Sequence, residues 1–111
     1  MSEFLRPWKV IEHTPEEVQL IADLLARGRE DAEVMQRVVA WTEAGEAEAE
    51  RVGIEARVLF ERRRASLYWR SGYRSDAEDT WDAAIEFARN ENRDDLCDAI
   101  IRERTALTHH P

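Results

Sequence analysis

Apolar residues recur along this chain at intervals of three and four residues, and no stretch alternates regularly between polar and apolar residues. That spacing is typical of helices that bury one face, whereas half-buried strands require an alternating pattern. Glycine and proline, which interrupt helices, are scarce, with four and three residues among 111. Alanine, glutamate, arginine and leucine, all good helix formers, dominate instead. The sequence therefore predicts an all-α protein, and its length favours a single domain covering residues 1–111.

Capping signals mark the first two helices. Thr14 and Glu17 form a capping box, and Gly28 ends the helix that they begin. Asp31 is a suitable N-cap for a second helix, and Gly45 is interpreted as the end of that helix. Each of these signals acts within one helical turn of its own position, so together they predict two short helices joined by a tight turn.

Three more helices are expected after residue 45. A long segment, residues 46–71, contains Gly53, which either breaks this helix or only weakens it. Ser75 and Glu78 read as a second capping box that begins a fourth helix. A fifth helix spans residues 94–107. Short turns favour antiparallel neighbours, so we expect about five helices packed as antiparallel hairpins.

The first residues, 1–13, are interpreted as an N-terminal arm. Trp8, Val10 and Ile11 are its large apolar residues downstream of Pro7, and they could pack against the body of the domain. No apolar run follows a basic start, and no segment approaches the length of about 20 apolar residues that spans a bilayer. We therefore expect a cytoplasmic protein without a membrane partner.

One motif stands out between Ala65 and Ala84. It reads Ala-x2-Tyr-x3-Gly-x4-Ala-x3-Trp-x2-Ala, carried by Ala65, Tyr68, Gly72, Ala77, Trp81 and Ala84. This pattern resembles the tetratricopeptide repeat, a helix-turn-helix hairpin in which small residues allow close helix approach and aromatic residues fill the groove. The resemblance implies a hairpin with a capping helix over residues 57–107. Because no second copy occurs at the spacing of about 34 residues, a small helical bundle is the alternative fold.

The resemblance also implies a partner-binding face. In this family, exposed positions of the first helix of the hairpin line a concave groove that contacts the ligand. The matching positions here are Leu59, Arg62, Ser66, Trp69 and Arg70, and we add Arg74, the last of six arginines between residues 57 and 74. Arginine grips carboxylates with two parallel hydrogen bonds, and tryptophan and arginine are frequent interface anchors. The competing interpretation is that these arginines form salt bridges with acidic residues of neighbouring helices.

Acidic residues suggest a different function. The net charge is -8, which disfavours direct binding of nucleic acid. Two acidic groups are conspicuous: Glu43, Glu46, Glu48 and Glu50, and then Asp76, Glu78, Asp79 and Asp82. Either group could cover a basic surface, as in an inhibitor, an antitoxin or an immunity-type protein, or could simply serve solubility and helix capping.

Catalytic and metal-binding signals are missing. His13, His109 and His110 have no partner at metal-ligand spacing, and Cys97 is a lone cysteine in an apolar stretch. The sequence contains no nucleophile motif and no glycine-rich phosphate loop. We therefore expect no catalytic residue, no metal and no cofactor. The leading hypothesis is a non-catalytic interaction module or adaptor for a protein or peptide, with an acidic inhibitor and a homodimer subunit as alternatives.

Overall fold

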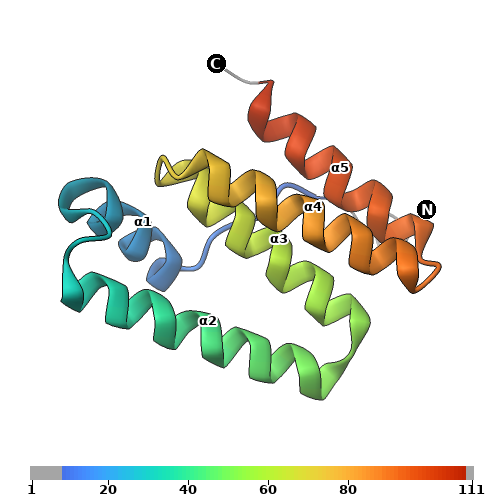
Figure 1. The fold of residues 1–111 in the computed structure, drawn as a ribbon, viewed down its shortest axis with the longest axis horizontal. Helices are drawn as coiled ribbons and strands as arrows, with labels where there is room; N and C mark the ends of the chain where they lie inside the picture. The colour runs from blue at the N-terminus through green and yellow to red at the C-terminus, as the bar shows by residue number, and fades with distance from the viewer. Residues whose placement is uncertain (1–8, 110–111) are drawn as a thin grey trace.

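The computed structural model describes residues 9–109 of the chain. In this part there are five α-helices: α1 (Pro15–Arg27), α2 (Ala32–Val52), α3 (Ile54–Arg70), α4 (Arg74–Asn90) and α5 (Asp94–Thr108) (Figure 1). The described residues contain no strand, and the all-α prediction is confirmed. Among these helices, none combines the length and hydropathy needed to cross a membrane.

The first two helix starts are those that the sequence predicts. The Thr14 hydroxyl accepts the Glu17 backbone N–H at 3.2 Å, and the Glu17 carboxylate accepts the Thr14 backbone N–H in return. At the start of α2, the Val34 backbone N–H donates to the Asp31 carboxylate at 3.0 Å and holds the pKa of Asp31 below its ordinary value. Both caps satisfy backbone donors that have no partner within the helix.

The prediction that Gly45 ends the second helix is wrong. Gly45 lies inside α2, which continues to Val52 and ends at Gly53, where φ is 136°. A Cβ atom on residue 45 would come within 2.0 Å of the Phe60 ring of α3. Gly45 is therefore needed for the close approach of α2 and α3, and the break falls at Gly53, whose positive φ suits glycine.

Replacing Gly45 by alanine should destabilise the protein by about 1–3 kcal/mol, because the Phe60 ring must leave its place. In an unobstructed helix the same change is stabilising by about 0.5–1 kcal/mol, so the expected sign is reversed. Urea denaturation followed by circular dichroism measures the effect. The double variant Gly45→Ala/Phe60→Leu serves as the control and should recover part of the loss.

The predicted capping box of Ser75 and Glu78 is also wrong. Helix α4 begins at Arg74, and its N-cap residue, Tyr73, makes no side-chain capping hydrogen bond. Instead, the Tyr73 backbone N–H donates to the Tyr68 carbonyl at 2.8 Å, and the Tyr73 hydroxyl accepts the Arg29 backbone N–H at 3.1 Å. The turn around Gly72 is therefore held by backbone hydrogen bonds to the last turn of α3 and by the contact with Arg29, and no side chain caps α4.

Helix α3 lies at the centre of the molecule and contacts all four other helices. Helices α1 and α5 pack on opposite sides of α3, so α1, α3 and α5 form one layer. Helix α2 packs on α1 and α3, and α4 packs on α3 and α5, so these two form a second layer (Figure 1). Successive helices run antiparallel, and the result is a compact array of helical hairpins of the kind that helical repeats build.

Two buried clusters hold the layers together. Trp81 and small residues of α3 and α4 pack with Ile100 of α5 in the first cluster, which includes Ala65, Ala77, Ala84 and Ala88. Leu20 and Leu24 of α1 pack with α2 and with Leu67 of α3 in the second cluster. Alanine at these contacts lets the helix backbones approach closely, and the single large indole of Trp81 fills the space that remains.

Candidate protein-interaction face

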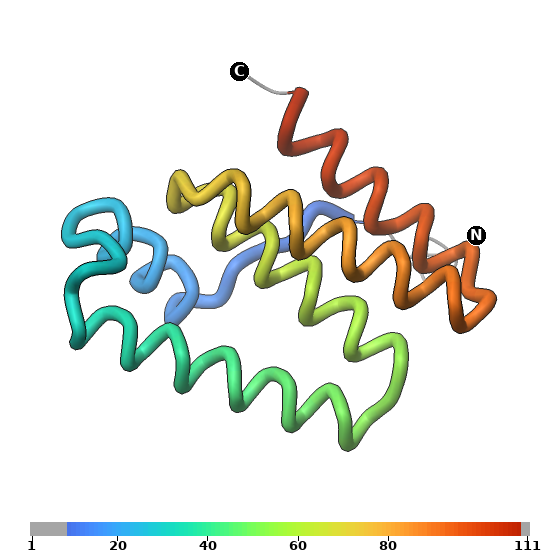
Figure 2. Tube along the Cα trace, viewed as in Figure 1, coloured from blue at the N-terminus to red at the C-terminus, as the bar shows by residue number. Residues whose placement is uncertain are grey.

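The layer of α1, α3 and α5 carries a segment of extended chain on its surface. This arm segment, residues 9–13, runs from beside α5 across α3 to the start of α1 (Figure 2). The expectation that the arm packs against the body is confirmed for Ile11, which is buried, whereas Val10 is largely exposed. Trp8 lies outside the described residues.

Side chains of the helices hold the backbone of the arm segment. Arg62 donates to the Lys9 carbonyl, and Arg63 donates to the Glu12 carbonyl at 3.2 Å. Glu103 of α5 accepts the backbone N–H of Ile11 at 3.1 Å. These contacts recognise main-chain groups of the arm segment, and the Ile11 side chain is buried in addition.

Beneath the arm segment lies a buried ion pair. The Arg62 guanidinium approaches the Glu103 carboxylate within 2.7 Å, and the two residues are 4% and 0% exposed. Charges removed from water in this way are tolerated only when they are paired and hydrogen-bonded. The pair therefore joins three elements, since α3, α5 and the arm segment all contribute to it.

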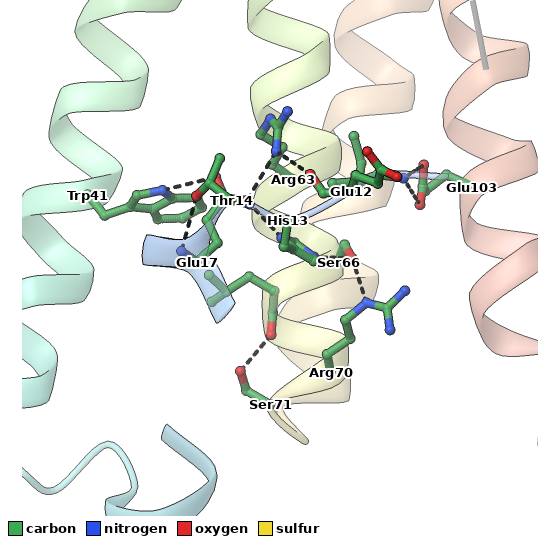
Figure 3. Close-up of polar contacts among 12 residues, drawn as sticks. Glu12, His13, Thr14, Glu17, Trp41, Arg63, Ser66, Arg70, Ser71 and Glu103 are labelled. Carbon is green, nitrogen blue, oxygen red and sulfur yellow. Dashed lines mark hydrogen bonds and ion pairs between the residues drawn. The ribbon is translucent and has the colours of Figure 1, made fainter. Parts of the chain in front are cut away.

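A second polar cluster anchors the end of the arm segment. His13 Nδ1 lies 2.8 Å from Glu17 Oε1, and His13 Nε2 lies 2.8 Å from Ser66 Oγ (Figure 3). Arg63 and the Trp41 indole N–H also donate to the Glu17 carboxylate. On the far side of Ser66, the Arg70 Nε–H donates to the same hydroxyl at 3.3 Å. The cluster therefore links the arm segment to the last turn of α3.

Two of the predicted partner-binding residues are not exposed. Arg62 and Ser66 were expected on an open groove, but Ser66 is fully buried and Arg62 nearly so. The arm segment and Glu103 cover them, and neither contact could be foreseen from residues near α3 in the sequence. Leu59 of the same helix is 42% exposed, as the prediction required.

The other three predicted residues lie together at the turn between α3 and α4. Trp69 is half-buried and packs on Trp81, with ring centroids 5.8 Å apart. The Arg74 guanidinium lies over the Trp69 ring, 4.6 Å from its centroid. Arg70, the last residue of α3, is exposed. We call Trp69, Arg70 and Arg74 the arginine–tryptophan surface.

The arginine–tryptophan surface holds two of the three arginines in residues 9–109 that have no carboxylate within ion-pair distance, and the third is Arg89 at the other end of α4. Most arginines of residues 9–109 lie within ion-pair distance of an aspartate or glutamate. Within the same range, Arg70 contacts only the Ser66 hydroxyl, and Arg74 contacts only the Trp69 ring. In a chain of net charge -8, two exposed arginines that flank one turn and have no carboxylate partner are unusual.

The acidic groups are partly neutralised inside the molecule. Arg104 of α5 pairs with Glu78 at 2.7 Å and with Asp82 at 2.9 Å, and Arg29 pairs with Asp76. In the first acidic group, Glu46 lies 3.8 Å from Arg64 and Glu48 lies 2.6 Å from Arg51, whereas Glu43 and Glu50 are exposed on α2. Much of the acidity at the start of α4 therefore serves helix packing.

Between residues 9 and 109, no group of three or more His, Cys, Asp or Glu is arranged to hold a metal ion. The Cys97 thiol is buried and points to the Ile85 carbonyl at 3.6 Å. No protein-family model, curated protein or solved structure matches this chain, so the resemblance to tetratricopeptide repeats stays a prediction.

Proposed function

We propose that this protein is a non-catalytic interaction module that docks an acidic segment of a partner protein on the arginine–tryptophan surface. The observation that carries the proposal is that Arg70 and Arg74 have no oppositely charged partner within residues 9–109. Both are exposed, and neither has a carboxylate partner among the described residues, although acidic side chains outnumber basic ones in the chain. A partner carboxylate would supply the counter-charge that the chain itself does not bring to this place.

The chemistry of the three side chains supports this use. A guanidinium binds a carboxylate through two parallel hydrogen bonds, which gives both energy and a defined orientation. The Trp69 ring, backed by Trp81, offers rigid apolar area next to these donors. Arg74 is already placed by its contact with that ring, so less conformational freedom is lost when it binds.

In this proposal the fold is tetratricopeptide-like, with α3 and α4 as one hairpin and α5 as its cap. The layer of α1, α3 and α5 supports it, because in such arrays the first helices of successive hairpins lie side by side. The arm segment offers a second support, since it shows that extended chain fits across this layer. Buried Ala65, Ala77 and Ala84 occupy the small positions of the motif.

The double variant Arg70→Glu/Arg74→Glu should bind an acidic probe at least about tenfold more weakly, because two attractive contacts of about 1 kcal/mol become repulsive. The probe is a fluorescently labelled peptide that contains Glu, Asp and Leu, and fluorescence anisotropy measures its affinity. Arg89→Glu is the matched control, since Arg89 is an exposed arginine at the far end of α4.

The control reverses one charge and the double variant reverses two. A proportionate loss of binding free energy in the control would therefore mean that only net charge matters, and the proposal would then fail. No measurable binding to the unaltered protein, at probe concentrations up to the millimolar range, would also reject it. If instead a basic peptide binds and Glu43→Gln/Glu50→Gln removes that binding, the acidic-inhibitor alternative replaces it.

A further inference from the structure

Helix α1 exposes a stripe of aliphatic side chains that the core does not use. Val18 is 54% and Leu25 is 62% exposed, and Ala22 is exposed between them. Positions 18, 22 and 25 follow the spacing of one helix face. We call these three residues the α1 stripe. A continuous aliphatic stripe on an otherwise strongly charged surface marks a contact area.

The α1 stripe lies on the side of the helix that is turned away from α2. Leu20 and Leu24 point into the core. Asp23 pairs with Arg37 of α2, and residues 16 and 19 line a hollow with residues 37 and 40 of α2. The α1 stripe occupies the remaining direction, which is exposed and faces neither the core nor α2.

The register of α1 against α3 places the end of the α1 stripe level with Arg70 of the arginine–tryptophan surface. Near the start of α1, Glu17 pairs with Arg63 at 3.1 Å, and just after its end the Arg29 backbone N–H reaches the Tyr73 hydroxyl at 3.1 Å. The two helices therefore run parallel, and Leu25 lies level with the last turn of α3. That turn carries Arg70.

We propose that the partner segment is amphipathic, with acidic residues that meet Arg70 and Arg74 and leucine-type residues that cover the α1 stripe. This inference rests on the proposed function and adds the apolar half of the recognition. Charge complementarity argues for the acidic part of the segment, because the two guanidinium groups lack carboxylates among the described residues. The adjoining stripe argues for the aliphatic part, because covering Val18 and Leu25 removes apolar surface from water.

Two labelled peptides of equal length and equal negative charge test the inference. One alternates acidic residues with leucine, and the other carries serine in place of each leucine. Fluorescence anisotropy should show the leucine peptide binding at least about tenfold more tightly to the unaltered protein. The variant Val18→Gln/Leu25→Gln should lose this preference. Val39→Gln is the matched control, because Val39 is 47% exposed but lies on α2, in the other layer.

The outcomes separate this inference from the function on which it rests. Equal binding of both peptides, still weakened by Arg70→Glu/Arg74→Glu, would overturn the amphipathic partner and leave the acidic one. Binding that none of the arginine variants changes would overturn both. Light scattering on the unaltered protein completes the test: a dimer that Val18→Gln/Leu25→Gln dissociates would mean that a second copy covers the stripe, and the inference would be wrong.

Discussion

Glu103→Ala should lower the free energy of unfolding by about 3–5 kcal/mol, the typical cost of breaking a buried ion pair by removing one partner. The change takes away the carboxylate that neutralises Arg62 in the interior and that accepts the backbone N–H of Ile11. Among the described residues, it also removes the only hydrogen bonds that link α5 to the arm segment. Urea denaturation measures the loss, and hydrogen exchange at the Ile11 amide should accelerate in parallel.

A double variant checks the origin of this effect. Arg62→Met/Glu103→Leu removes both charges and keeps similar volume, so it should be more stable than Glu103→Ala alone. A loss below about 1 kcal/mol for Glu103→Ala would contradict the prediction, because it would place the pair in the range of solvent-exposed salt bridges.

Trp81→Ala should lower the free energy of unfolding by about 3–5 kcal/mol, the range found when a buried aromatic side chain is truncated. Trp81 is fully buried at the centre of the cluster that joins α3, α4 and α5, so the cavity would lie where three helices meet. Trp69 packs on the same ring, so the arginine–tryptophan surface should loosen as well. Thermal unfolding reports the stability, and the acidic peptide reports the surface.

Trp81→Phe provides the conservative comparison. The Trp81 indole N–H is buried without a hydrogen-bond partner among the described residues, so phenylalanine removes volume but no hydrogen bond. We therefore expect a clearly smaller loss than for alanine. Equal losses for the two variants would contradict this expectation, because they would mean that the indole N–H makes a stabilising contact of its own.

The glycines show which helix ends can be predicted from local sequence signals. Gly28, Gly45 and Gly53 are the same residue type in stretches of good helix formers, and the sequence predicts a helix end at the first two. Gly28 and Gly53 do end helices, whereas Gly45 lies within α2. Gly28 and Gly53 have positive φ, whereas at Gly45 the ring of Phe60, on another helix, occupies the space of the missing Cβ atom.

The arginines of α3 give the same lesson for the candidate site. Arg62 and Arg70 are eight positions apart on one helix, and the motif assigns both to an open groove. In the folded protein Arg62 is buried against Glu103, which lies 41 positions away in the sequence, while Arg70 stays exposed. Both residues are arginines on the same helix, so residue type alone cannot show which of them pairs with a carboxylate that is distant in the sequence.

The sequence by itself determined the helical class and the caps at Thr14 and Asp31, because these depend on residues within about one turn of each other. The tertiary structure alone decided that α2 passes through Gly45, that the arm segment crosses α3, and that Arg62 is buried. Each of these depends on contacts between residues far apart in the chain, where close packing and the pairing of buried charges select one partner among many.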